Sequence, residues 1–169
     1  SVITGTNIRD LLIGSQSGET LIGLAGNDDL LARGGDDILR GGDGADILDG
    51  GDGFDIADYE GSNVEIRGDL LARIGQGGHA QGDTYRNIEG IVGSQYADQL
   101  YGTLGANYLA GSGGNDLIDG NGGADTLLGG TGDDRLIGGE GADRIDGGEG
   151  IDTSDYSLST APVHIDLAA

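Results

Sequence analysis

The sequence of 169 residues lacks cysteine, tryptophan and lysine, and it has one proline and only 4% aromatic residues. Without cysteine the chain can form no disulfide, thiolate nucleophile or zinc–thiolate site. Without lysine it has neither a P-loop lysine nor a Schiff-base lysine. No apolar run approaches the roughly 18 residues of a membrane-spanning helix, and nothing at the start resembles a signal peptide. We therefore expect a chain that does not cross a membrane and that is an excised piece of a larger polypeptide.

Positive charge is also scarce, because eight basic residues stand against 30 acidic ones and the net charge is -22. Such a charge opposes direct binding to nucleic acid or to an anionic membrane and favours cations as partners. An acidic chain with 38 glycines would ordinarily be disordered. Here, however, the acids are mostly Asp and occupy fixed places among the glycines instead of forming blocks, which argues against a merely solvating tail.

A nine-residue unit of the form GGxGxDxUx, where U is a large aliphatic residue, recurs in two blocks and is clearest from Gly41 to Asp49. The sixth positions, nine residues apart within each block, are Asp10, Glu19, Asp28, Asp37, Asp46 and Asp55, then Asp98, Asn107, Asp116, Asp125, Asp134, Asp143 and Asp152. The eighth positions are Leu12, Leu21, Leu30, Leu39, Leu48 and Ala57, then Leu100, Leu109, Ile118, Leu127, Leu136, Ile145 and Ser154. A short fixed period of this kind indicates a solenoid.

Within a unit, the glycine-rich half favours a turn, and the xUx half alternates polar and aliphatic residues like a very short strand with U facing inward. The sequence therefore predicts an all-β fold, a parallel β-roll (β-solenoid) with two units per coil. Residues 18 apart would then lie above one another, so that Asp10, Asp28 and Asp46 form one column. A second column on the opposite side would include Asp37 and Asp55.

The repeat is interrupted between Asp55 and Asp98, whose separation is not a multiple of nine. We therefore expect two stacks, residues 1–58 and 93–156, joined by a short capping insert of residues 59–92, with residues 157–169 starting a further flanking segment. Alternating apolar residues at Val64, Ile66 and Leu70 favour strands in the insert. Its stretch from Gly75 to Gly82 is poor in apolar residues, and a flexible linker is the alternative.

The carboxylate columns require a counter-ion. One inward aliphatic residue per nine buries too little apolar surface to offset the entropy of ordering the chain, and stacked carboxylates repel one another. The available donors are carboxylates and the backbone carbonyls of glycine-rich turns, with no thiol. Ca²⁺ accepts six to eight oxygens in flexible geometry, whereas Mg²⁺ demands a tight octahedron and tends to keep its waters. The sequence therefore predicts several bound calcium ions.

These units resemble the hemolysin-type calcium-binding repeats of the RTX (repeats-in-toxin) family. The resemblance implies a calcium-bound β-roll with ions between consecutive turns, and secretion of the parent protein by a bacterial type I system. It also implies a chain that is disordered at low calcium and folds outside the cell. The ligands it implies are Asp10, Asp28, Asp37, Asp46, Asp55, Asp98, Asp116, Asp125, Asp134, Asp143 and Asp152.

Departures from the repeat gather in the first two units of each block. Glu19 and Asn107 replace Asp at the sixth position, and Ile8 and Tyr96 replace Gly at the fourth position. We therefore expect sites that use these units to be weak or empty.

Catalysis is not expected, because the chain has no HExxH or GxSxG motif and no pair of carboxylates with a nearby histidine. The leading hypothesis is a secreted, extracellular calcium-binding module that forms part of a larger bacterial polypeptide. One alternative is an adhesive segment of a toxin or adhesin that binds a cell-surface receptor or glycan, because loops between rigid stacks often carry recognition. The other is a C-terminal folding module of a secreted enzyme.

Overall fold

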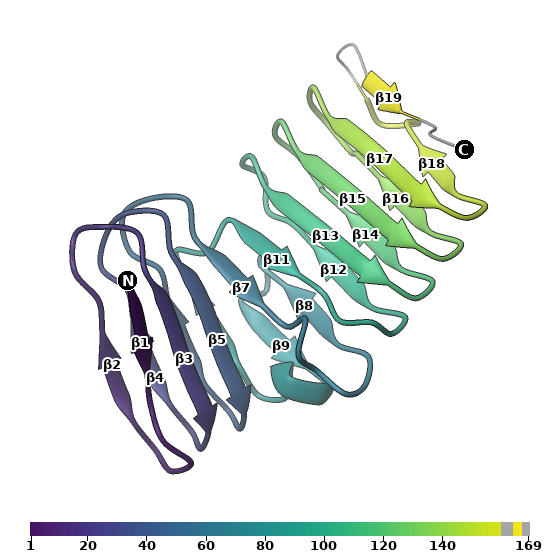
Figure 1. The fold of residues 1–169 in the computed structure, drawn as a ribbon. Coiled ribbons are helices and arrows are strands. Elements are labelled where there is room, and N and C mark those ends of the chain that lie inside the picture. The colour runs from purple at the N-terminus through teal and green to yellow at the C-terminus, as the bar shows by residue number, and fades with distance from the viewer. Residues whose placement is uncertain (160–163, 167–169) are drawn as a thin grey trace.

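The chain coils into two facing β-sheets in the computed structural model, which describes residues 1–159 and the backbone of residues 164–166. Successive repeat units place their strands alternately in one sheet and then in the other, and the coils stack from the N-terminal end to the C-terminal end (Figure 1). The predicted all-β parallel solenoid is confirmed. No helix of the described residues is long and apolar enough to cross a membrane.

Within the described residues, one sheet has nine strands, all of them paired in parallel. In spatial order they are β1 (Val2–Thr4), β3 (Thr20–Ala25), β5 (Ile38–Asp43), β7 (Ile56–Asp58), β11 (Gly90–Val92), β13 (Tyr108–Gly113), β15 (Thr126–Thr131), β17 (Arg144–Glu149) and β19 (His164–Asp166). We call it the nine-stranded sheet.

The other sheet has ten strands in the described part of the chain and is called the ten-stranded sheet. In spatial order they are β2 (Leu11–Ile13), β4 (Asp29–Leu31), β6 (Ile47–Asp49), β10 (Thr84–Arg86), β9 (Ile74–Gln76), β8 (Arg67–Asp69), β12 (Gln99–Tyr101), β14 (Leu117–Asp119), β16 (Arg135–Ile137) and β18 (Thr153–Asp155). One short 3₁₀ helix, η1 (Gly78–Ala80), follows β9.

The strand register reproduces the predicted coil of two units. Leu12 of β2 lies beside Leu30 of β4, and Leu30 lies beside Leu48 of β6, so that each partner is 18 residues further along the chain. Leu21 and Leu39 are paired in the same way in the nine-stranded sheet. Like positions of the repeat therefore form straight columns along the solenoid.

The core is the space between the two sheets, and it is filled by the eighth-position residues. Because side chains alternate across a strand, the central residue of each three-residue strand points inward and its neighbours point outward. Leu21, Leu30, Leu39 and Leu48 are each 0% exposed. The same inward column continues through the second block, from Leu100 to Ile145. The alternation in the sequence thus predicts the burial correctly.

The insert joins the two repeat blocks through hydrogen-bonded strands in both sheets, so it is not a flexible linker. In the nine-stranded sheet a single strand, β11, bridges β7 and β13. In the ten-stranded sheet three strands bridge β6 and β12, and the middle one, β9, is antiparallel to both β8 and β10. Three strands on one side against one on the other make the junction a wedge, and the strands of the two blocks run in different directions across it (Figure 1).

Candidate metal-binding columns

The sixth-position aspartates lie in turns at the edges of the sheets, directly before each short strand. Asp28 and Asp46 precede β4 and β6, whereas Asp37 and Asp55 precede β5 and β7. Each of the two edges therefore carries one column of carboxylates. Nine of these aspartates are only 0% to 3% exposed, namely Asp28, Asp37, Asp46, Asp55, Asp98, Asp116, Asp125, Asp134 and Asp143. The sequence pattern has thus placed charged groups in a nearly dry environment.

One oxygen of each carboxylate is used to connect neighbouring coils. The backbone N–H of Asp28 donates to Oδ1 of Asp46 at 2.8 Å, and Asp37 donates to Asp55 in the same way at 2.8 Å. In the second block Asp116 donates to Oδ1 of Asp134 at 2.8 Å. The columns are therefore ladders of hydrogen bonds from backbone to side chain, repeated every 18 residues.

The other oxygen has no partner. Buried Oδ2 atoms without any hydrogen bond occur in Asp28, Asp37, Asp46, Asp55, Asp116, Asp125, Asp134 and Asp143. A buried polar atom without a partner is costly and uncommon in native proteins. The orphan oxygens all belong to one repeat position, so they indicate a common missing partner that carries positive charge.

The surroundings of these oxygens suit a hard cation. A Cβ atom built on Gly23, the first residue of the unit that ends at Leu31, would lie 2.5 Å from Oδ2 of Asp28 and 2.5 Å from the carbonyl oxygen of Gly41 in the next coil. Carboxylate and carbonyl oxygens thus converge on a space that glycine leaves open. Ala32, which holds this first position before Asp37, is the exception. All-oxygen surroundings fit Ca²⁺.

Carboxylates alone do not make the site, because the described residues contain no group of three or more His, Cys, Asp or Glu side chains that could hold a metal ion. Backbone carbonyls would have to complete the coordination. The residues that would hold calcium are therefore the eight aspartates with orphan oxygens, together with the carbonyls of the glycine-rich turns.

Burial raises the pKa of six of these eight carboxyl groups, those of Asp37, Asp46, Asp55, Asp116, Asp125 and Asp134. It raises the pKa of Asp46 and of Asp55 from 3.8 to about 6, although a backbone hydrogen bond to each acts in the opposite direction. It raises the pKa of Asp116 and of Asp125 to about 7. Without a cation these four carboxyl groups therefore bind a proton at a higher pH than an exposed aspartate does.

Three of the predicted ligands differ from these eight. Asp152 accepts the N–H of Asp134 at 3.0 Å but is only half-buried at the end of its column. Asp10 and Asp98, at the column starts, already have local donors for their second oxygens: Thr6 and Ser94 respectively. The structure thus aligns all eleven predicted residues in the columns but leaves orphan oxygens in only eight of them.

Two further acids of the insert continue the columns, and the sequence analysis missed them. The N–H of Asp46 donates to Oδ1 of Asp83 at 2.8 Å, and the N–H of Asp55 donates to Oε2 of Glu89 at 2.9 Å. Each acid stands two residues before a buried apolar residue, Tyr85 or Ile91. Glu89 is also nine residues before Asp98. That offset could have identified Glu89 from the sequence.

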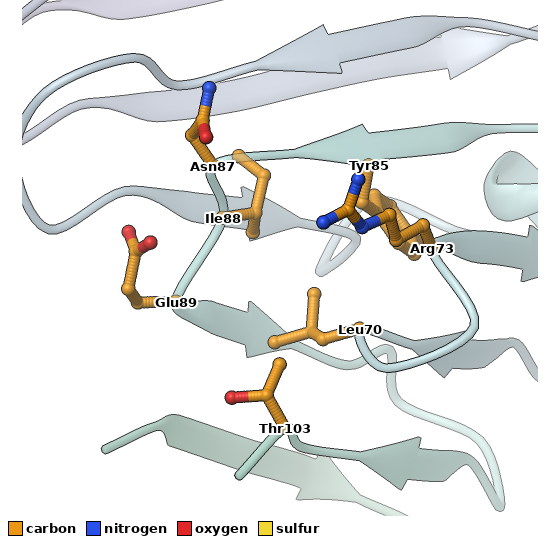
Figure 2. Close-up of a pocket in the computed structure, with 7 residues that line it drawn as sticks. All are labelled: Leu70, Arg73, Tyr85, Asn87, Ile88, Glu89 and Thr103. Carbon is orange, nitrogen blue, oxygen red and sulfur yellow. The ribbon is translucent and has the colours of Figure 1, made fainter. Parts of the chain in front are cut away.

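A pocket of about 220 Å³ opens at the wedge-shaped junction. It is lined by Leu70, Arg73, Tyr85, Asn87, Ile88, Glu89 and Thr103 (Figure 2). In this view the side chain of Arg73 reaches toward Ile88 and Leu70, and Glu89 lies across the pocket from it. The pocket therefore combines a cationic group, an anionic group and an apolar floor.

Comparison with known proteins identifies the repeats. The RTX calcium-binding nonapeptide repeat matches in four copies, at residues 4–39, 22–57, 92–127 and 119–153. A search of curated proteins gave no match. The four copies together span both repeat blocks and most of the sequence, and they coincide with the coils that carry the carboxylate columns. The chain therefore belongs to the RTX calcium-binding nonapeptide repeat family.

Proposed function

We propose that this calcium-binding β-roll couples its own folding to the calcium concentration outside the cell, and that it serves a larger bacterial protein exported by a type I system. RTX repeat proteins are typically secreted bacterial proteins. The proposal assigns no catalysis to these residues.

The eight orphan carboxylate oxygens carry the proposal. Each belongs to an Asp residue that is at most 3% exposed, and it has no hydrogen-bond partner, so its negative charge is neither solvated nor paired within the described residues. A bound divalent cation supplies the positive charge that these oxygens lack. The aspartates themselves hold the turns of neighbouring coils together through their Oδ1 atoms.

Folding and metal binding are then one process. The ligands come from turns that are adjacent only when the coils are stacked, so the unfolded chain has no preformed site and the free energy of binding becomes free energy of folding. Extracellular calcium modules bind with dissociation constants of roughly 10⁻⁴ to 10⁻³ M. At such affinities the low calcium of the cytosol leaves the chain unfolded, which suits export.

A calcium titration followed by far-UV circular dichroism tests the coupling. The expected result is a disordered spectrum in excess chelator and a cooperative gain of β-structure as calcium is added. Magnesium at the same concentrations is the control and should be much less effective. A β-sheet spectrum that is the same with chelator and with calcium would refute the proposal.

The junction pocket favours a second candidate function, recognition of a small polar group such as part of a cell-surface glycan. Arg73 forms no ion pair within the described part of the chain, although the sequence has 30 acidic residues and only eight basic ones. Its guanidinium is thus available to a ligand that also contacts Glu89. Glycan-array binding by the calcium-loaded chain tests this function. Arg73→Asn should abolish binding, whereas Arg33→Asn, the same change outside this pocket, should not.

A further inference from the structure

Four turns of the repeats satisfy the sixth-position side chain without any metal. In each, the second residue of the unit is Ser or Thr, and both its N–H and its hydroxyl donate to the sixth-position oxygens. The pairs are Thr6 with Asp10 (2.6 and 2.9 Å), Ser15 with Glu19 (3.0 and 2.6 Å), Ser94 with Asp98 (2.5 and 2.9 Å) and Thr103 with Asn107 (2.6 and 3.0 Å). We call these four the hydroxyl-capped turns.

The hydroxyl also fixes the turn itself. The hydroxyl of Ser94 accepts the N–H of Tyr96 at 3.1 Å, and that of Thr103 accepts the N–H of Gly105 at 3.0 Å. Ser15 accepts the N–H of Ser17 at 3.2 Å. All these bonds join residues at most four apart. A hydroxyl-capped turn is therefore closed by its own residues, whereas a turn with an orphan oxygen is not.

Serine at the second position is not sufficient to cap a turn. Ser112 is the second residue of the unit that contains Asp116, but its φ is 78° and its hydroxyl faces the carbonyl oxygen of Gly93 at 3.4 Å. Oδ2 of Asp116 is left without a partner. Ser94 and Thr103 lie outside the left-handed region, which lets their N–H groups reach the sixth position. The backbone of the second residue thus separates the two kinds of turn.

The sixth-position residues follow the same division. All eight orphan oxygens belong to Asp, and the two departures from Asp, Glu19 and Asn107, both occur in hydroxyl-capped turns. Asn107 is a neutral amide whose Oδ1 accepts both Thr103 bonds, while its Nδ2 donates to the carbonyl oxygen of Glu89 at 2.9 Å. A cation has no charge to neutralise there.

A fifth hydroxyl acts at the other end of the first block. Tyr59 is 1% exposed, and its hydroxyl donates to Oδ2 of Asp83 at 2.7 Å and lies 2.9 Å from the hydroxyl of Tyr85. Asp83 occupies the column position after Asp46. Its second oxygen is thus satisfied by a tyrosine where its neighbour in the column has an orphan oxygen.

We propose that these hydroxyl groups determine where calcium binding begins and ends in each column. The proposal rests on the proposed function, because it assumes that the orphan oxygens bind calcium. Turns with Thr6, Ser15, Ser94 and Thr103 close the first coil of each block without metal, and Tyr59 closes the end of one column. These turns stay metal-free because side-chain hydroxyls already occupy the carboxylate or amide oxygen that calcium would take.

The unit of Asn107 offers the sharpest test, because it differs from the full GGxGxD pattern only at Thr103 and at Asn107 itself. Calcium ions bound to the whole chain are counted by equilibrium dialysis and by calorimetry. Asn107→Asp alone should bind the same number of ions as the wild type. Thr103→Gly combined with Asn107→Asp should bind one more. A gain with the single variant, or no gain with the double variant, would overturn the proposal.

A second pair of variants tests the loss of a site within one column. Asp28→Asn should remove at least one ion and raise the calcium concentration at the folding midpoint severalfold, whereas Asp10→Asn should leave the ion count unchanged and the midpoint within about twofold. Equal losses in the two variants would contradict the hydroxyl cap at Asp10. A wild-type chain that binds no calcium at all would instead refute the proposed function, so the two failures are distinguishable.

Discussion

Acidification should have opposite effects on the calcium-free and the calcium-loaded chain. In the calcium-free chain the buried aspartates must either remain charged in a dry turn or bind a proton. The pKa of Asp46 is raised by burial from 3.8 to about 6, and that of Asp116 from 3.8 to about 7. At about 1.4 kcal/mol per pKa unit, keeping the charge costs at most about 3 kcal/mol at Asp46 and at most about 4 kcal/mol at Asp116, because solvent screening reduces both costs.

The direction of the effect follows from proton linkage. A carboxyl whose pKa is raised in the folded state binds more protons there than in the unfolded chain. The penalty is complete above the folded-state pKa, and it is relieved as the pH falls from about 7 toward the ordinary value of about 4. Total stabilities of domains are only about 5 to 15 kcal/mol. Two such carboxylates should therefore strongly destabilise a calcium-free roll at neutral pH, and protonation should restore part of its structure.

The assay is far-UV circular dichroism of the chain without calcium, recorded from about pH 7.5 to about pH 5, which stays above the sequence pI of about 4.1. We expect the β-sheet signal to rise as the pH falls. In saturating calcium the urea midpoint should instead fall with the pH, because protons compete with the ion for carboxylates. Light scattering controls for aggregation. A calcium-free chain that is fully folded at pH 7.5, or that loses structure on acidification, would refute the reasoning.

Two substitutions test the remaining parts of the site. Gly23→Ala places a Cβ atom 2.5 Å from Oδ2 of Asp28, so the calcium concentration at the midpoint of a dichroism titration should rise severalfold. Gly61→Ala is the matched control, because its Cβ atom would meet nothing closer than 3.9 Å, and its midpoint should equal that of the wild type. Tyr59→Phe removes the donor to the buried Oδ2 of Asp83, which should lower the free energy of unfolding in calcium by about 1 to 3 kcal/mol. Urea denaturation measures this change, and an unaltered midpoint would show that another donor replaces the hydroxyl.

The nine-residue period carries enough information to predict the coil, the inward column and the carboxylate columns. Each of these depends on one unit and on its copy 18 residues away, so local pattern and spacing suffice. Leu39 and Asp46, for example, are buried where the repeat predicts. The insert is different. Strand β10 pairs with β6 of the first block, β8 pairs with β12 of the second block, and β9 lies antiparallel between β8 and β10. Those pairings depend on distant segments, which the period does not encode.

Turn chemistry was the harder part to predict. Ser94 and Ser112 occupy the same place in the repeat, yet one hydroxyl reaches a carboxylate and the other reaches a backbone carbonyl. Tyr96 stands at the fourth position of the unit that contains Ser94, and Gly114, with φ of 105°, stands at the fourth position of the unit that contains Ser112. A side chain at the fourth position disfavours the left-handed conformation that glycine adopts there. The departures from the repeat at the start of each block therefore mark hydroxyl-capped turns, and they are not merely weakened copies of the repeat.

The junction determines how the two blocks influence each other. In a solenoid each coil contacts only its neighbours, so stability spreads from coil to coil. On one edge the column continues from Asp55 through Glu89 to Asn107 by hydrogen bonds. On the other edge it is divided, because Asp83 ends the first column and the meander of β8, β9 and β10 separates it from Asp98. Order gained in one block can therefore pass to the other along one edge by side-chain contacts, and along the other edge only through the strands of the insert.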